Sequence, residues 1–274
     1  MAAEPLFGSS RKVRIQHLRA AKDNGDKWPM LTAYDRYSAE IFDQAGIPVL
    51  LVGDSAANNV YAHDSTLPIR TEQLLPLVEA VARSARRALV IGDLPFGSYE
   101  VSPEQAFHTA VSFMKAGAQA VKLEGGSSIV PQVKHLTEAG IPVMSHLGFT
   151  PQKLHSMGGY RVQGRGEAAD HLLTEAEALQ DAGAFALGLE LMPVDVARRI
   201  TEHLAIPTVG IGAGPHCDAQ VLIWQDLAGL RGGTMPRYVK QYLALRADLT
   251  EAVRTFAKEV GEGVFPAPEN CFEE

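Results

Sequence analysis

The chain has 274 residues, of which 46% are hydrophobic and 21% charged, a balance typical of a globular protein with a sizeable core. Its formal net charge of −7, without any basic stripe, argues against a nucleic-acid partner but leaves small anionic substrates open. The two cysteines, Cys217 and Cys271, form neither a metal-type cluster nor a disulfide framework. The N-terminus lacks the apolar core of a signal peptide, and no apolar run approaches the roughly 18 residues of a membrane span, so we predict a cytoplasmic protein without a membrane partner.

Short apolar runs alternate with segments of helical periodicity along most of the chain. The eight expected strands are residues 30–35, 49–55, 88–93, 120–125, 142–148, 184–191, 207–214 and 226–230. Glycines that suit the left-handed end of a helix stand shortly before several of these strands, at Gly46, Gly117, Gly140 and Gly183. This alternation predicts a parallel sheet, and eight units predict a closed (β/α)8 barrel.

An open doubly wound sheet is the alternative architecture. No Gly/Pro/Ser-rich linker divides the chain. We therefore expect a flexible N-terminus over residues 1–11 and a single α/β barrel domain over residues 12–274. An extra helix is expected before the first strand, and a long helix is expected from about Thr234 to residue 260.

Carboxylates stand at the ends of three consecutive expected strands. They are Asp54, Asp93 and Glu124. The active site of a barrel lies at the carboxyl ends of its strands, and neighbouring strands are about 4.8 Å apart, so these groups can converge. Converging carboxylates repel one another, and a hard divalent cation such as Mg²⁺ removes that penalty. For each residue alone, a role as helix cap or turn residue is the alternative.

Three further polar residues belong to the same strand ends. Lys122 lies two residues before Glu124 and therefore faces the same side of the strand. Its expected role is either to bind a substrate carboxylate or oxyanion, or to neutralise the acidic cluster. His146 ends the fifth expected strand as a site residue or a structural histidine. Glu190 ends the sixth, either as a general base or as the partner of an arginine such as Arg165 or Arg198.

Two glycine-containing loops also follow expected strands. The first, GIGAGP at residues 210–215, either binds phosphate or makes a tight turn. The second, GGYRVQGRG at residues 158–166, suits a mobile cover over an anionic ligand or an oligomer contact.

Seven motifs in order carry a resemblance to the ketopantoate hydroxymethyltransferase (3-methyl-2-oxobutanoate hydroxymethyltransferase) family. They are MLTAYD, LLVGDSAANNVYAHDSTLP, GDLPFGSYE, AVKLEGG, HLGFTPQ, GGYRVQGRG and PTVGIGAG. The resemblance runs from about residue 12 to about residue 272. It implies a barrel of the phosphoenolpyruvate/pyruvate type, in which 5,10-methylenetetrahydrofolate gives a one-carbon unit to α-ketoisovalerate through a metal-stabilised enolate. The product would be 2-dehydropantoate, for pantothenate and coenzyme A biosynthesis.

The resemblance also implies residue roles. The metal ligands match Asp54, Asp93 and Glu124, which would hold one Mg²⁺ per subunit. The keto-acid contacts match Asp54, Ser55, Asp93 and Lys122, His146 falls at an active-site position, and the catalytic acid or base matches Glu190. Family members are cytosolic and commonly decameric. Many end in a segment like Glu-His-Ser-Phe, where this chain has Asn270 in place of histidine. This difference puts in doubt any role of the tail in closing the active site.

Two other functions are open at this point. A metal-dependent carbon–carbon lyase of the same barrel superfamily would share the Mg²⁺ and enolate chemistry but would not use folate. A non-catalytic assembly or binding barrel is the second alternative, and the converging charges argue against it because a structural barrel has no need of them.

Overall fold

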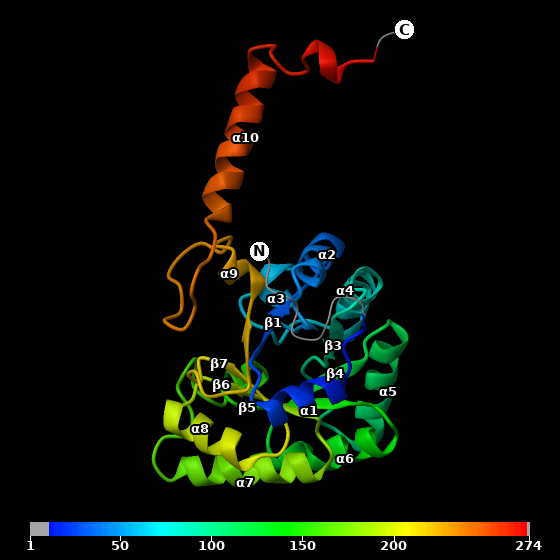
Figure 1. Cartoon of the computed structure of the whole chain (residues 1–274), viewed down its shortest axis with the longest axis vertical. Coiled ribbons are helices and arrows are strands. Elements are labelled where there is room, and N and C mark those ends of the chain that lie inside the picture. Colours follow the sequence, from blue (N-terminus) through cyan, green and yellow to red (C-terminus); the bar gives the residue numbers. More distant parts are fainter. Residues whose placement is uncertain (1–10, 273–274) are drawn as a thin grey trace. The chain divides into compact units, whose positions relative to one another are not determined.

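The computed structural model describes residues 11–272, and its first compact unit, up to Leu222, is a closed barrel of eight parallel strands (Figure 1). Each strand pairs with the next along the chain, and β8 pairs with β1 to close the sheet. The strands are β1 (Trp28–Thr32), β2 (Val49–Val52), β3 (Leu89–Asp93), β4 (Ala120–Glu124), β5 (Val143–Gly148), β6 (Ala186–Glu190), β7 (Thr208–Ile211) and β8 (Ala219–Leu222). The predicted (β/α)8 class is confirmed.

The last strand does not lie where the sequence predicted it. Residues 226–230 begin within a short helix, and β8 is instead Ala219–Leu222. Ala219 is opposite both Trp28 of β1 and Val209 of β7, so this short strand closes the barrel. The exposed Gln220 interrupts its apolar residues, so it lacks the continuous apolar run that predicts a buried parallel strand.

One helix precedes β1, and further helices connect the strands up to β7 and surround the barrel (Figure 1), whereas no helix joins β7 to β8 in the described part of the chain. They are α1 (Ile15–Asn24), α2 (Arg36–Gln44), α3 (Ala56–Asn59), α4 (Thr71–Ser84), α5 (Pro103–Lys115), α6 (Val130–Glu138), α7 (Ala168–Asp181) and α8 (Val194–His203). Short 3-10 turns lie at Ser127–Ile129 and Pro151–Lys153. The glycines expected at helix ends are in the left-handed region, with φ of +90° at Gly46 and +97° at Gly183.

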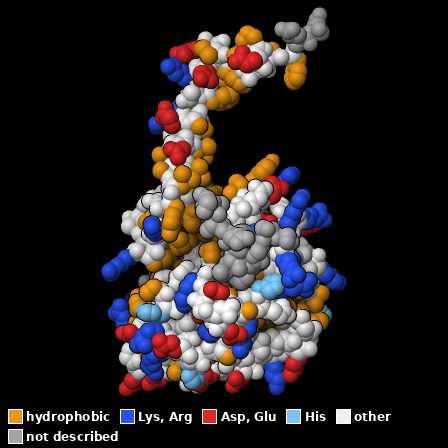
Figure 2. All heavy atoms as spheres, viewed as in Figure 1, with side chains coloured by type: hydrophobic (Ala, Val, Ile, Leu, Met, Phe, Trp, Pro, Cys, Tyr) orange, Lys and Arg blue, Asp and Glu red, His pale blue; other side chains and the backbone are white. Residues whose placement is uncertain are grey.

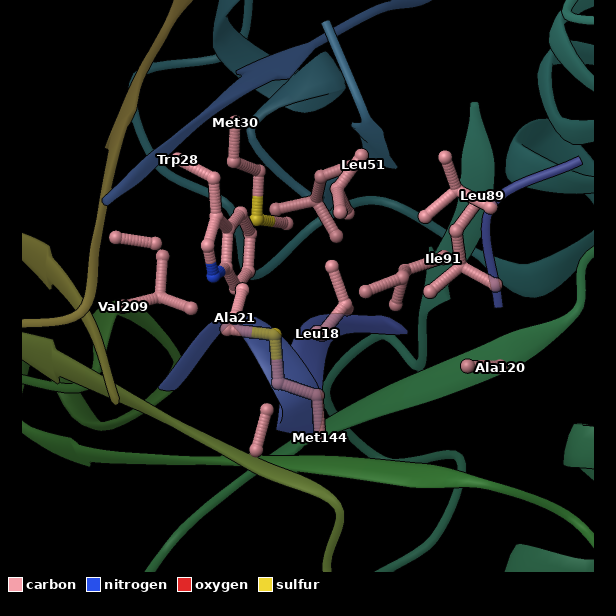
Figure 3. Close-up of a cluster of buried hydrophobic side chains, with 14 residues drawn as sticks. Leu18, Ala21, Trp28, Met30, Leu51, Leu89, Ile91, Ala120, Met144 and Val209 are labelled. Atoms are coloured by element: carbon pink, nitrogen blue, oxygen red, sulfur yellow. The ribbon is translucent and has the colours of Figure 1, made fainter. Parts of the chain in front are cut away.

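The predicted N-terminal helix, α1, packs against the apolar layer of the barrel interior (Figure 3). Leu18 and Ala21 belong to the same buried cluster as Trp28 and Met30 of β1 and Met144 of β5. The other members come from the beginnings of the neighbouring strands, such as Leu89, Ala120, Ala186 and Val209. The amino ends of the strands are therefore filled with hydrophobic side chains, which leaves the carboxyl ends for chemistry.

Residues from Ile223 onward form a second compact unit with α9 (Trp224–Leu227), α10 (Leu245–Gly261) and a 3-10 turn at Pro268–Asn270. The long helix predicted from about Thr234 is shorter at its start, because residues 234–244 are not helical. Hydrophobic side chains line α10 (Figure 2), where Leu249, Val253, Phe256 and Val260 are exposed. Among the described residues, no helix combines the length and apolar composition that crossing a membrane requires.

The sequence predicts one domain over residues 12–274, whereas the structure groups the described residues into two compact units. That the second unit is part of a single barrel domain stays a prediction. The predicted flexible segment falls almost wholly on residues 1–10, which lie outside the described residues.

Candidate metal centre and active site

Three carboxylates converge at the carboxyl ends of β2, β3 and β4. Asp54, Asp93 and Glu124 each offer an oxygen, and these oxygens all lie within 4.8 Å of one another. The residues are 3%, 1% and 2% exposed, so water does not screen the repulsion between their charges. The convergence that the sequence predicted is therefore present.

The alternation of the strands explains why charges follow an apolar layer. On β3 the inward face passes from Leu89 through Ile91 to Asp93, and on β4 from Ala120 through Lys122 to Glu124. Because side chains two residues apart share a face, an apolar layer at the amino ends of these strands is followed by a charged layer at their carboxyl ends. The register places Asp93 opposite Lys122, which brings the two charges together.

Lys122 is the cation inside this acidic cluster. Its Nζ lies 2.7 Å from Oδ1 of Asp93 and 3.0 Å from Oε1 of Glu124. Burial lowers the pKa of the ammonium, but Asp93, Glu124 and Asp54 outweigh burial and raise the pKa well above its ordinary value. Lys122 is therefore a permanent positive charge, and of the two roles considered for it, the neutralising contact is present.

One ammonium does not balance three carboxylates. Burial and the charge of Glu124 raise the pKa of Asp54 to about 6, against the opposing effect of Lys122. Burial also raises the pKa of Asp93 to about 6, with Lys122 opposing the shift and Asp54 adding to it. A cation at this position would relieve the same repulsion, and a set of carboxylate oxygens suits a hard ion such as Mg²⁺.

His146 and Glu190 form a second polar pair at the ends of β5 and β6. His146 Nε2 lies 3.2 Å from Oε2 of Glu190 and 3.0 Å from the carbonyl oxygen of Phe149. Since both partners are acceptors, Nε2 carries the proton. Burial lowers the pKa of His146, but the hydrogen bond to Glu190 and the nearby carboxylates raise it above its ordinary value.

The space for this pair depends on Gly188, the inward residue of β6 before Glu190. A Cβ at this position would lie 2.8 Å from Nδ1 of His146, so glycine makes room for the imidazole ring. Arg198, one arginine considered as the partner of Glu190, instead pairs with Asp195 and Glu202 on its own helix. Glu190 thus lies beside a histidine, which suits a group that exchanges protons.

Ser55 follows Asp54 and precedes α3. Its Oγ lies 2.8 Å from the hydroxyl of Tyr34, a buried residue after β1. The main-chain N–H of Asp54 donates to Oδ2 of Asp93 over 3.1 Å, which fixes the beginning of this loop. Tyr34 lies in a motif noted in the sequence, but no functional role was predicted for it.

Two buried residues that the sequence did not single out also contact the acidic cluster. Gln152, in the turn after β5, contacts both Asp54 and Glu124. Tyr99, in the loop after β3, contacts Gln152 and the main chain of Glu124. Both residues lie in motifs that carry the family resemblance, but no role was predicted for them, because a loop has no periodicity that fixes the direction of its side chains.

The glycine-containing loops lie where the sequence placed them, after β5 and β7. In the loop at residues 158–166, Tyr160 packs on Phe149 with 4.8 Å between ring centroids, and the N–H of Gln163 donates to the carbonyl of Leu191. In the loop at residues 210–215, Gly214 has a φ of +83°, as a tight turn requires. The ligand-binding roles suggested for both loops stay predictions.

Comparison with known proteins decides the family. A profile of the family described as Ketopantoate hydroxymethyltransferase matches residues 12–268. The chain belongs to this family. It is 62% identical over 271 residues to the 3-methyl-2-oxobutanoate hydroxymethyltransferase of Saccharopolyspora erythraea, an alignment that covers 97% of this chain and 92% of the relative. It is 59% identical over 263 residues to the enzyme of the same name from a Nocardioides species, with 96% and 89% covered.

Solved structures support the fold assignment of this family member. Phosphonopyruvate hydrolase, in a complex with oxalate and Mg²⁺, is similar with a TM-score of 0.62 at 16% identity, over 94% of this chain and 93% of the other. A 2,3-dimethylmalate lyase of the phosphoenolpyruvate mutase/isocitrate lyase superfamily is similar with a TM-score of 0.58 at 17% identity, over 94% and 91%. At these identities the likeness concerns the fold alone.

Proposed function

We propose that this chain is a 3-methyl-2-oxobutanoate hydroxymethyltransferase, which converts α-ketoisovalerate and 5,10-methylenetetrahydrofolate to 2-dehydropantoate and tetrahydrofolate. The observation that carries the proposal is the convergence of Asp54, Asp93 and Glu124 around Lys122, together with the pair of His146 and Glu190, in a chain of this family. The family supplies the reaction, and the side chains supply groups that suit it.

The reaction balances with one water molecule. The C3–H bond of the keto acid breaks, and so do the two bonds that join the methylene carbon to the folate nitrogens. A bond forms between C3 and the methylene carbon, and a second forms between that carbon and the oxygen of water. The C3 proton and one water proton supply the two N–H groups of tetrahydrofolate, and the other water proton stays on the new hydroxyl.

Asp54, Asp93 and Glu124 would hold Mg²⁺, one ion per subunit. Mg²⁺ commonly takes one or two carboxylates together with waters and substrate oxygens, and this cluster offers only oxygen ligands. When bound, the cation would polarise the ketone of the substrate and lower the free energy needed to remove its C3 proton. The raised pKa values of Asp54 and Asp93 fit such a site, because a cation stabilises their charged forms.

The remaining side chains would bind and move protons. Lys122 would bind the substrate carboxylate or the oxygen that gains negative charge, since its ammonium stays protonated. Glu190 would accept the C3 proton, and His146 would orient the Glu190 carboxylate through its Nε2–H. Ser55 would contact the keto acid, with its hydroxyl held by Tyr34.

Hydrogen–deuterium exchange at C3 of α-ketoisovalerate, followed by NMR in D₂O, tests this proposal. Samples contain protein with Mg²⁺, protein with EDTA, and protein with Mg²⁺, tetrahydrofolate and formaldehyde. We expect exchange that requires the metal, and a new hydroxymethyl signal in the third sample. Exchange without that signal favours a lyase of the same superfamily, and well-folded protein without exchange or product contradicts the proposal.

The homodecamer and the cytoplasmic location that the family resemblance implies stay predictions. Sedimentation velocity of the full chain tests the first of them, with a single species of about ten subunits as the expected result.

A further inference from the structure

We propose that Gln152 is a positioning residue that holds Asp54 and Glu124 in the geometry that binds the cation. The inference rests on the proposed metal site and adds to it a residue that is not itself a ligand. It starts from the position of Gln152, which is 4% exposed in the turn after β5 and reaches carboxylates from β2 and β4.

Gln152 bonds the two carboxylates with two different groups. Its main-chain N–H donates to Oε2 of Glu124 over 3.1 Å. Its side-chain Nε2 donates to Oδ2 of Asp54 over 3.1 Å and to the carbonyl oxygen of Leu94 over 2.9 Å. One residue therefore fixes the separation of two carboxylates that lie 70 residues apart in the sequence, from position 54 to position 124.

The orientation of the Gln152 amide is determined by its surroundings. Both hydrogens of Nε2 face oxygen acceptors, on Asp54 and Leu94. The reversed amide is unfavourable, because its carbonyl oxygen would then face these two oxygens and could not donate to them. The Oε1 atom accepts from the hydroxyl of Tyr99 over 2.6 Å. The same hydroxyl accepts from the main-chain N–H of Glu124 over 3.2 Å, so a chain of hydrogen bonds runs from Glu124 through Tyr99 and Gln152 to Asp54.

The chemistry of these donors suits a cation site. Lys122 also bonds the cluster, but it cancels one negative charge as it does so. The amide and the main-chain N–H of Gln152 are neutral, so they orient Asp54 and Glu124 and leave their charge available. Groups that orient metal ligands in this way commonly change metal affinity by about 10- to 100-fold when they are removed.

Gln152→Met tests the inference, because it keeps the length of the side chain and the main-chain N–H but removes the amide. The matched control is Gln132→Met on α6. Gln132 is also buried, at 5% exposed, but its amide donates to the carbonyl oxygens of Tyr99 and Glu100 at 3.4 Å rather than to a carboxylate. The probe is Mn²⁺, whose free and bound forms are measured by electron paramagnetic resonance without turnover.

We expect the Kd of Mn²⁺ to rise about 10- to 100-fold in Gln152→Met and to stay at the wild-type value in Gln132→Met. The thermal unfolding midpoint in EDTA should fall by similar amounts in both variants, which separates metal affinity from general stability. Tyr99→Phe, which leaves the Gln152 amide in place without its hydroxyl donor, should give a smaller rise in Kd.

A wild-type Kd in Gln152→Met, or an equal loss of affinity in Gln132→Met, overturns the inference while the metal site stands. If Gln152→Met does not fold, a wild-type Kd in Tyr99→Phe overturns it instead. Wild-type protein that binds no Mn²⁺ overturns the metal site itself, and the role of Gln152 with it.

Discussion

The main-chain N–H of Asp54 donates a hydrogen bond to Oδ2 of Asp93 over 3.1 Å, so the backbone at one expected metal ligand positions the carboxylate of another. Asp93 is the last residue of β3, and Asp54 lies two residues after the end of β2, which pairs with β3 in parallel. The cluster is thus ordered by the protein itself, which allows its charge and its geometry to be tested separately.

Asp93→Asn tests the charge. The asparagine carbonyl can still accept from the N–H of Asp54, but the cluster loses one negative charge. We expect the affinity for Mn²⁺ to fall at least about 100-fold and turnover to be lost, because ionised carboxylates are the ligands that bind hard cations. Isothermal titration calorimetry measures the affinity, and an unchanged circular dichroism spectrum in EDTA is the control for folding. Wild-type affinity in the variant would remove Asp93 from the ligand set.

Metal affinity should depend on pH near 6. In the metal-free protein the pKa values of Asp54 and Asp93 are raised to about 6, above the ordinary value of 3.8. The metal requires the ionised forms, so protons compete with it below this pH and not above it. A group with this pKa is about one-tenth ionised one unit lower, so the Kd of Mn²⁺ should be at least about 10-fold higher at pH 5 than at pH 7.5. Equal affinities at the two pH values would contradict the raised pKa values.

Glu190→Gln separates proton removal from metal binding. The amide keeps the size of the side chain but cannot accept the C3 proton. We expect deuterium exchange at C3 to slow about 10²- to 10⁴-fold, while Mn²⁺ binds with wild-type affinity. NMR in D₂O measures the exchange, and the metal titration is the control. Wild-type exchange in this variant would assign the base to another group.

Lys122→Met should make the stability of the protein depend on the metal. Lys122 is buried against Asp93 and Glu124, and removing one partner of a buried ion pair commonly costs about 3–5 kcal/mol. We expect the free energy of unfolding in EDTA, measured in urea at pH 8, to fall by about this amount and to recover largely in Mg²⁺, which compensates the same carboxylates.

Lys22→Met is the matched control for this experiment. Lys22 Nζ lies 2.8 Å from Oδ2 of Asp218 and 2.9 Å from the carbonyl oxygen of Thr201, so its partners are not the three carboxylates proposed to bind the metal. Its loss should also lower stability, but Mg²⁺ should not restore it. Recovery of both variants in Mg²⁺ would show a general effect of the ion rather than binding at the carboxylate cluster.

The carboxylates at or just after the strand ends could be predicted from the sequence, and the loop residues that contact them could not. Asp93, Glu124 and Glu190 end strands, and the two-residue alternation of a strand gives the direction of their side chains. Tyr99 and Gln152 lie in loops, where contacts with Asp54 and Glu124 depend on a path that the local sequence does not determine.

The eighth strand was predicted at the wrong residues because its local sequence also does not determine its contacts. Ala219–Leu222 is short, and its pairing with β1 and β7 comes from closure of the whole barrel. The apolar character of residues 226–230 belongs instead to α9 and the turn after it. A strand whose position depends on closure of the barrel can be recognised from the assembled sheet but not from its own sequence.

The order of the strands divides the proposed chemistry between two sectors of the barrel. Asp54, Asp93 and Glu124 come from β2 to β4, whereas His146 and Glu190 come from β5 and β6. A substrate bound across both sectors would keep its oxygen-rich end beside the first and its reacting carbon beside the second. Substitutions on β5, β6 and the loops after them would then change which carbon reacts, and with what partner, without touching the three carboxylates that would hold the cation.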